Sequence, residues 1–333
     1  MVQEKTKTFQ KSVKMARPLR IVYMGNPDFA VRPLQIMLEH NYNVVTVVTG
    51  QDKPAGRGKK MNESAVKVFA REQNLPILQP ESLKDEEFLT QLRALQIDLI
   101  VVVAFKMLPK VVWQIPTIGT INIHASLLPQ YRGAAPINWA IINGETKTGV
   151  TSFLINEKID TGNILLQKEV EITETETAGT LHDKLQESGS QLLIETLHVL
   201  ESGKIQGISQ TTLYGDEAEL KPAPKIFKET CKIDWNKPTT TINNQIRGFS
   251  PYPGAWTTIQ KNSTTLVFKI FSAECSFEKH NLTPGTITES NKHIAIATAD
   301  GFLKPIEIQL EGKKRMNISD FLCGFSFADA VIQ

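Results

Sequence analysis

The residues best suited to chemistry lie in one short stretch, residues 119–136. Asn122 and His124 alternate in a run that predicts a strand, so both side chains project from the same face. The amide of Asn122 could donate to a developing oxyanion, and the imidazole of His124 could exchange protons near neutral pH. Asp160 lies in a predicted turn between two strands and could orient or charge-balance His124. These three form the candidate catalytic group, although an Asn/His pair at a strand end is, taken alone, more often structural.

A second candidate is a basic loop within residues 51–60. Its cationic side chains are Lys53, Arg57, Lys59 and Lys60, and they oppose a single acidic residue in that range. Two glycines give the backbone freedom, so the loop could follow a phosphate backbone. A solvated run of charge is the alternative reading.

Other kinds of site lack their usual signature. The turn after the first predicted strand holds one glycine, Gly25, where a dinucleotide site needs G-x-G-x-x-G. The three cysteines have no paired spacing, which argues against a disulfide framework and favours a reducing compartment. The remaining histidines lack metal-ligand spacing; they are His40, His182, His198, His280 and His293. We therefore expect neither a bound nucleotide cofactor nor a metal.

Strands and helices alternate along the first two thirds of the chain. Apolar and β-branched runs predict strands at 19–24, 43–49, 75–77, 97–103, 120–123, 150–154 and 164–172. Helical spacing predicts helices at 29–39, 65–72, 85–95, 134–143 and 180–201. This alternation predicts an α/β fold with a doubly wound, mostly parallel sheet, in which ligands bind beyond the carboxyl ends of the strands.

The composition changes after this region. Residues 202–224 are rich in Gly, Ser, Thr, Gln and Pro, which predicts a linker. Short apolar runs then recur at 256–259, 266–271, 286–287, 293–298 and 302–310, as in a small OB-like β-barrel. We predict an extension at 1–18, a catalytic domain at 19–204, a linker at 205–224 and a C-terminal domain at 225–333.

The overall composition is that of an ordinary globular protein. The chain has 333 residues, 41% of them hydrophobic and 22% charged, with a formal net charge of +2. No apolar run approaches the roughly 18–20 residues that a membrane span needs, so we expect a cytoplasmic protein without a membrane anchor. Residues 1–18 are lysine-rich without an apolar core, which argues against a secretory signal and leaves a basic arm or an unpacked extension.

The motifs around the candidate triad resemble those of the folate-dependent formyltransferase family. The resemblance rests on residues 122–129, on residues 132–136 (Arg-Gly-Ala-Ala-Pro) and on the Asp-Thr-Gly of residues 160–162. Family members use 10-formyltetrahydrofolate and place an Asn, a His and an Asp around the formyl carbon. The resemblance implies these roles for Asn122, His124 and Asp160.

The same resemblance implies a folate pocket. The family's Ser-Leu-Leu-Pro folate contact corresponds to Ser126, Leu127, Leu128 and Pro129. Ala104, which follows a predicted strand, is assigned to the same pocket. The segment 105–109 that comes next is a residue shorter than the family's usual Tyr-Gly-x-x-Leu-Pro, which leaves its pterin contacts open.

A narrower resemblance is to the members that act on methionyl-tRNA. Residues 25–30 (Gly-Asn-Pro-Asp-Phe-Ala) are similar to their first turn, with Asn26 where they usually have Thr. The basic loop and residues 247–255 are also similar, which implies tRNA contacts at Lys53, Arg57, Lys59, Lys60, Lys225 and Arg247. The implied partners are initiator methionyl-tRNA and a folate, and we expect a monomer.

Three alternatives remain open at this point. A formyltransferase that acts on glycinamide ribonucleotide would share the triad but would not need the basic loop or the C-terminal domain. A sugar-nucleotide formyltransferase could carry an extra domain but leaves the basic loop unexplained. A non-enzymatic RNA-binding module would bind tRNA without forming a folate-dependent product.

Overall fold

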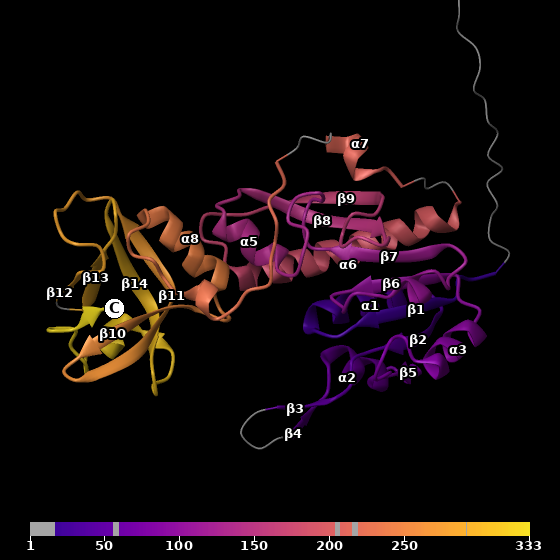
Figure 1. Ribbon diagram of the computed structural model, residues 1–333, viewed down its shortest axis with the longest axis horizontal. Helices are drawn as coiled ribbons and strands as arrows, with labels where there is room; N and C mark the ends of the chain where they lie inside the picture. Colours follow the sequence, from indigo (N-terminus) through magenta and orange to yellow (C-terminus); the bar gives the residue numbers. More distant parts are fainter. Residues whose placement is uncertain (1–16, 56–59, 204–206, 215–218, 291) are drawn as a thin grey trace, which may run out of the picture. The chain divides into compact units, whose positions relative to one another are not determined.

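The computed structural model describes residues 17–55, 60–203, 207–214, 219–290 and 292–333 (Figure 1). The basic-loop residues Arg57 and Lys59 and the predicted extension up to residue 16 lie outside these ranges. Two compact units divide the chain. The first comprises Met1–Pro129, Val150–Lys168 and Gln186–Ala218, and the second comprises Gln130–Gly149, Glu169–Leu185 and Glu219–Gln333. The predicted domain boundaries at 204 and 225 stay a prediction.

A seven-stranded sheet dominates the N-terminal half, in the order β5-β2-β1-β6-β7-β8-β9. Its strands are β1 (Ile21–Gly25), β2 (Val44–Val48), β5 (Ile77–Leu78), β6 (Leu99–Val103), β7 (Gly119–His124), β8 (Lys147–Leu154) and β9 (Ile164–Glu171). The chain runs outward from β1 to β5 and then returns to β6 beside β1, so strand order reverses between β1 and β6. The predicted doubly wound, mostly parallel sheet is confirmed. Strands β6 and β7 pair in parallel, whereas β8 pairs antiparallel to β7.

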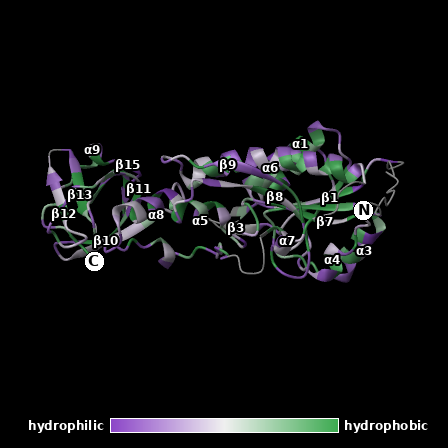
Figure 2. Ribbon diagram, turned by 90° about the horizontal axis from the view of Figure 1, so that it is seen from above, coloured by the Kyte–Doolittle hydropathy of each residue, from purple (hydrophilic) through white to green (hydrophobic). Residues whose placement is uncertain are grey.

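The helices of this half begin and end close to the predicted positions, except for one short helix at Lys110–Trp113 that was not predicted. They are a 3-10 turn η1 (Asp28–Ala30), α1 (Val31–Glu39), α2 (Ala65–Glu72), α3 (Glu86–Ala94), α4 (Lys110–Trp113), α5 (Pro136–Ile142) and α6 (Ala178–Glu201). The apolar strand runs form the core, visible as green ribbon around β1 and β7 in Figure 2. None of the described helices is both long and apolar enough to span a membrane.

Two segments expected to be irregular contain short regular elements. The predicted linker 202–224 contains a short helix, α7 (Gln210–Tyr214). The predicted basic loop contains two short antiparallel strands, β3 (Lys53–Ala55) and β4 (Lys60–Asn62), which flank residues 56–59. Lys53 and Lys60 therefore lie on paired strands.

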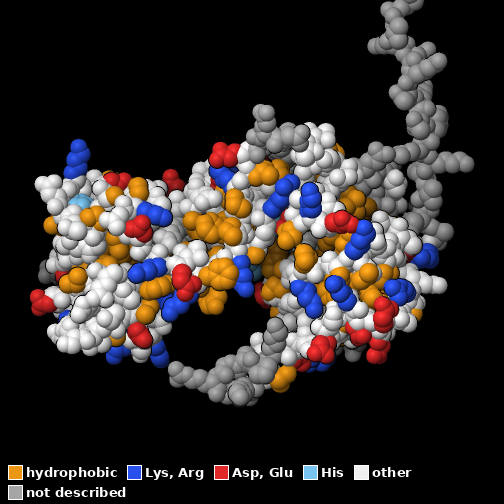
Figure 3. All heavy atoms as spheres, viewed as in Figure 1, with side chains coloured by type: hydrophobic (Ala, Val, Ile, Leu, Met, Phe, Trp, Pro, Cys, Tyr) orange, Lys and Arg blue, Asp and Glu red, His pale blue; other side chains and the backbone are white. Residues whose placement is uncertain are grey.

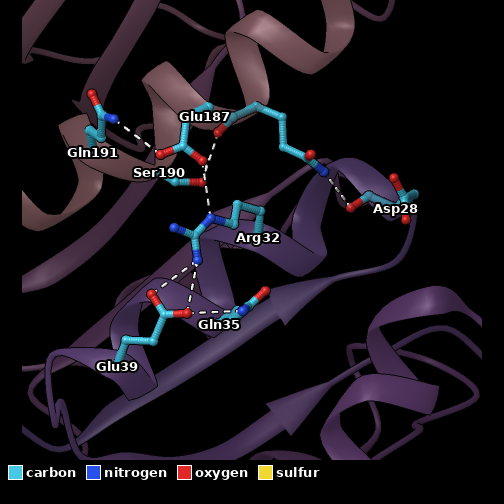
Figure 4. Close-up of polar contacts among 8 residues, drawn as sticks. Asp28, Arg32, Gln35, Glu39, Glu187, Ser190 and Gln191 are labelled. Carbon is cyan, nitrogen blue, oxygen red and sulfur yellow. Dashed lines mark hydrogen bonds and ion pairs between the residues drawn. The ribbon is translucent and has the colours of Figure 1, made fainter.

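Polar contacts attach α6 to α1 within the first unit (Figure 4). Arg32 on α1 donates Nε to Glu187 on α6 at 3.0 Å and Nη1 to Glu39 at 3.0 Å. The hydrogen bonds that Arg32 donates, first to Glu187 and then to Glu39, raise the pKa of Arg32. Gln186 adds a hydrogen bond from its Nε2 to the carbonyl oxygen of Asp28, at 2.8 Å. Because Arg32 and its partners are partly exposed, these contacts orient α6 more than they stabilise the fold.

A buried carboxylate anchors the chain just before β1. Asp98 is 3% exposed and accepts hydrogen bonds from Arg17 Nη1 (2.7 Å), the Arg20 backbone N–H (2.9 Å) and Thr117 Oγ1 (3.2 Å). Burial raises its pKa, but these hydrogen bonds outweigh burial, and the pKa of Asp98 is lowered overall. The charged form is therefore the one that stabilises the folded state.

Replacing Asp98 with Asn should lower the free energy of unfolding at pH 7 by about 2 kcal/mol, because charge-assisted hydrogen bonds are lost. The pKa of Asp98 is lower in the folded than in the unfolded state, so this contribution is complete above the unfolded pKa of about 3.9 and is lost as pH falls through the folded value. Urea unfolding of both proteins at pH 7 and pH 3 measures this. The exposed Asp85→Asn variant is the control, and an equal stability difference for Asp98→Asn at both pH values would contradict the account.

The C-terminal half forms an antiparallel sheet that curves around its own core (Figure 1). Its strands are β10 (Ala255–Lys261), β11 (Thr264–Ser276), β12 (Ile287–Ser290), β13 (His293–Ala297), β14 (Phe302–Leu310), β15 (Met316–Asn317) and β16 (Val331–Ile332). This confirms the predicted smaller β-barrel domain. Two helices, α8 (Thr239–Phe249) and α9 (Ile318–Phe321), and a 3-10 turn η2 (Glu229–Cys231) were not predicted.

Charge is not segregated on the surface in view. Figure 3 shows Lys and Arg side chains interspersed with Asp and Glu over that face, as the small net charge of +2 allows. Recognition of an anionic partner would therefore depend on local groups of cations rather than on the overall charge.

Candidate active site

The predicted triad comes together at the carboxyl end of β7. Asn122 and His124 are the fourth and sixth residues of this strand, so both project from one face. Asp160 lies in the turn between β8 and β9, and its Oδ2 is 3.9 Å from Nδ1 of His124. The side chains of His124 and Asp160 are only 8% and 17% exposed. The structure thus places the carboxylate facing the imidazole, in largely buried surroundings.

The distance between the imidazole and the carboxylate limits how they can act. At 3.9 Å the separation between Nδ1 of His124 and Oδ2 of Asp160 is too long for a direct hydrogen bond. A bridging water would fit a separation of this kind. Phe153 packs edge-on against the imidazole, with ring centroids 6.5 Å apart, and holds the ring in place.

Ala104 lies beside His124 at the same edge of the sheet. Val103 on β6 pairs with Ile123 on β7, so the next residue on each strand, Ala104 and His124, follows the same register. Ala104 is exposed and has φ of +47°, a conformation that a residue with a side chain adopts at a cost. Its small, exposed side chain at the strand end suits the predicted ligand pocket.

The predicted folate motif is held by side chains that the sequence did not single out. Thr151, opposite His124 on β8, donates Oγ1 to the carbonyl oxygen of Ser126 at 2.6 Å and accepts from the backbone N–H of Leu128 at 3.1 Å. Gln167 on β9 donates Nε2 to the Leu128 carbonyl oxygen and to Thr151 Oγ1, both at 2.9 Å. These contacts fix the backbone that follows His124.

Three of the four motif residues are buried, and the fourth, Leu127, is partly exposed. Ser126 and Leu128 are 0% exposed, and the Leu128 side chain packs against Phe153 and Ile164. Leu127 is partly exposed, whereas Pro129 is buried. A ligand at this motif would therefore contact backbone atoms and Leu127 rather than the side chain of Leu128.

Replacing Thr151 with Val should lower the free energy of unfolding by about 1–3 kcal/mol, because it leaves the Ser126 carbonyl and the Leu128 N–H buried without this partner. The shape of the side chain is kept, so packing changes little. Thermal unfolding measures the loss, and Thr148→Val is the matched control, since the buried hydroxyl of Thr148 has no hydrogen-bond partner among the described residues. A Thr151→Val variant as stable as Thr148→Val would contradict this assignment.

The predicted tRNA contacts differ in how they are placed. Lys225 is exposed, with Nζ 5.6 Å from the centroid of the Phe227 ring. Arg247 on α8 is half-buried and donates Nη1 to the Glu176 carbonyl oxygen and Nη2 to Asn244 Oδ1, both at 2.7 Å. Desolvation by burial lowers the pKa of Arg247. The geometry of Lys225 suits a phosphate contact, whereas that of Arg247 suits packing within its own unit.

Metal ligation finds no support in the part of the chain that the structure describes. No three His, Cys, Asp or Glu side chains gather there as a metal ion would need. His182 and His124 each face one carboxylate, of Asp183 and Asp160.

Comparison with known proteins identifies relatives over nearly the whole chain. Residues 19–197 match the family model described as formyl transferase, and residues 225–326 match its C-terminal domain model. A methionyl-tRNA formyltransferase of Parabacteroides distasonis is 55% identical over 310 residues, which cover 92% of this chain and 96% of that protein. One of Flavobacterium johnsoniae is 52% identical over 311 residues, 93% and 98% of the two chains.

Solved structures share the fold at lower identity. The sugar 3N-formyl transferase WlaRD, crystallised with dTDP and 5-N-formyl-THF, has a TM-score of 0.63 at 23% identity, over 90% of this chain and 100% of that chain. HypX of Aquifex aeolicus in complex with tetrahydrofolic acid has a TM-score of 0.60 at 19% identity, over 92% of this chain and 47% of that chain.

Proposed function

This chain belongs to the formyl transferase family, and on that premise we propose that it formylates initiator methionyl-tRNA. The formyl donor is 10-formyltetrahydrofolate, and the acceptor is the α-amino group of the esterified methionine. The observation that carries the proposal is the identity of more than half of all aligned residues with proteins named methionyl-tRNA formyltransferase, over more than nine tenths of both chains.

The chemistry proceeds by direct attack. An α-amino group has an ordinary pKa of about 7.7–8.0, so a neutral fraction able to attack is present near pH 7. A bond forms between the methionine nitrogen and the formyl carbon, and the carbonyl oxygen becomes an oxyanion. The bond between the formyl carbon and the folate nitrogen then breaks, and the proton lost by the amine is returned to that nitrogen. The products are formylmethionyl-tRNA and tetrahydrofolate.

Each member of the triad has a place in this sequence. Asn122 and His124 donate hydrogen bonds to the oxyanion, a type of contact worth about 2.7–4 kcal/mol of transition-state stabilisation. The Asp160 carboxylate, 3.9 Å from His124 Nδ1, orients the ring and balances its charge, or holds a water that relays the proton. The buried surroundings support this role, since charge interactions strengthen where water is excluded.

The folate and the tRNA occupy different parts of the chain. The folate lies along residues 126–129 and Ala104, at the strand ends beside the triad. The tRNA backbone contacts the basic residues Lys53, Arg57, Lys59, Lys60 and Lys225, while Arg247 is held by hydrogen bonds within its own unit. Because the proposed acceptor belongs to translation initiation, we place the activity in the cytoplasm, and we expect a monomer.

A single assay separates this function from its alternatives. The protein is mixed with 10-formyltetrahydrofolate and, in parallel, with initiator methionyl-tRNA, elongator methionyl-tRNA, glycinamide ribonucleotide or an amino sugar nucleotide. Formation of tetrahydrofolate is followed together with the formylated product. We expect turnover with initiator methionyl-tRNA and little with the others. Turnover with a sugar nucleotide alone, or tRNA binding without any product, would reject the proposal.

A further inference from the structure

We infer that Gln210, on α7, is a positioning residue for Asp160. This inference rests on the proposed function, which gives the Asp160 carboxylate its role beside His124. It assigns part of the active site to the segment that connects the two matched family models, residues 198–224. Gln210 acts through Asp160 and does not itself touch the reacting atoms.

The contact that carries the inference is a double hydrogen bond from one amide. Nε2 of Gln210 donates to the carbonyl oxygen of Asp160 and to that of Gly162, both at 2.9 Å. Gln210 is 3% exposed, so water does not compete for these hydrogen bonds. Because the two carbonyls are two residues apart, the amide fixes the shape of the turn rather than the position of a single atom.

The segment that carries Gln210 is itself attached to β9. Ile208 and Ile164 exchange backbone hydrogen bonds of 2.8 and 2.9 Å in an isolated antiparallel bridge. Gly207 also lies close to Asn163, since a Cβ at Gly207 would lie 2.7 Å from Asn163 Cβ. Gln210 lies two residues beyond this bridge, so the bridge holds it next to the turn that contains Asp160.

The turn needs such support at Asp160 in particular. Asp160 has φ of +52°, in the left-handed region that residues with a side chain occupy at a cost. Thr161 is held separately, by hydrogen bonds from Oγ1 to Asn156 Oδ1 (3.0 Å) and to the Lys158 carbonyl oxygen (3.1 Å). Without Gln210 the Thr161 contacts would keep the turn closed, while the Asp160 and Gly162 carbonyls could rotate. The expected result is a folded protein whose carboxylate no longer faces His124.

The first test replaces Gln210 with Met, which has a similar length and no donors. We expect kcat to fall by about 100-fold, the scale of loss for a catalytic group displaced by about 1 Å. KM for 10-formyltetrahydrofolate and for methionyl-tRNA should stay close to wild type, because the inferred role of Gln210 is to hold Asp160 and not to bind a substrate. Wild-type protein is measured alongside. If wild type transfers no formyl group, the proposed function fails; if wild type is active and the variant has the same kcat, the inference about Gln210 fails.

A double-mutant cycle distinguishes positioning from a general structural role. Gln210→Met is introduced into wild type and into an Asp160→Asn variant. If Gln210 acts through Asp160, its replacement should cost little further activity once the carboxylate is gone. Losses that simply multiply would overturn the inference.

Two further variants keep the test informative about folding. Gln210→Asn retains an amide on a side chain that is one methylene shorter. Its kcat should lie between those of wild type and Gln210→Met, and a wild-type kcat would overturn the inference.

Gln245→Met removes a matched contact in the second unit, where Gln245 Nε2 donates to the carbonyl oxygens of Thr230 (3.2 Å) and Lys232 (3.0 Å). That control should melt earlier than wild type and keep its kcat, and an equal loss of kcat in the control would also overturn the inference.

Discussion

Replacing His124 with Ala is expected to lower kcat for formyl transfer by about 100- to 10,000-fold, the range for loss of a positioned acid–base group. The imidazole of His124 is buried at the end of β7 and is the ring that the Asp160 carboxylate faces, so no other side chain of the triad can replace it. The affinity for methionyl-tRNA should be preserved, because the basic residues assigned to tRNA lie elsewhere in the chain. Single-turnover formylation and filter binding measure the two quantities separately.

The control for this variant is His40→Ala. His40 is exposed at the end of α1, so its loss should change neither turnover nor binding. If His124→Ala kept the wild-type turnover, the triad would not be the catalytic group. If it lost tRNA affinity and turnover together, the assignment of binding and chemistry to different residues would be wrong.

The first sheet could be predicted well because its strands carry their signal locally. Residues 99–103 are a continuous apolar run, and the structure has β6 at Leu99–Val103, fully buried. A run of this kind has to be buried on both faces, which is what a central parallel strand provides. Strand direction has no such local signature, and the antiparallel pairing of β8 with β7 depends on the path of the whole chain.

Helix α8 shows why other elements escaped prediction. Ile242, Ile246 and Phe249 have helical spacing and are at most 1% exposed, so an amphipathic signal was present. Three Thr at its start and two Asn in its middle have weak helix propensity and obscured that signal. Packing of the apolar face into the C-terminal core outweighs these preferences.

The candidate site likewise contains some residues that could be predicted from the sequence and others that could not. Asn122 and His124 follow from strand alternation, and Asp160 from its place in a turn, so the triad could be proposed from the sequence. Thr151 and Gln210 could not, because their roles depend on which strand pairs with β7 and on where the segment after α6 returns. Such long-range contacts leave no mark in local composition.

Replacing Gly162 with Ala should have the largest effect on both stability and activity of any glycine substitution in the site. A Cβ built at Gly162 would lie 1.5 Å from the carbonyl oxygen of Leu154 and 2.8 Å from its carbonyl carbon. The backbone N–H of Leu154 donates to the Asn163 carbonyl oxygen at 2.9 Å, so the two chain segments are tied together at this point. Neither can withdraw without breaking the hydrogen bond, and we expect the free energy of unfolding to fall by about 3 kcal/mol.

The same substitution should also inactivate the folded protein that remains. Gly162 is two residues from Asp160, and its carbonyl accepts one of the two Gln210 hydrogen bonds, so a displaced Gly162 moves the carboxylate away from His124. Denaturant unfolding and kcat at a temperature well below the unfolding midpoint measure the two effects. Gly324→Ala is the matched control, because a Cβ there meets no atom of the described residues within 4 Å. A Gly162→Ala protein as stable and active as Gly324→Ala would show that the turn tolerates a side chain, and that Asp160 is not held where the catalytic assignment requires it.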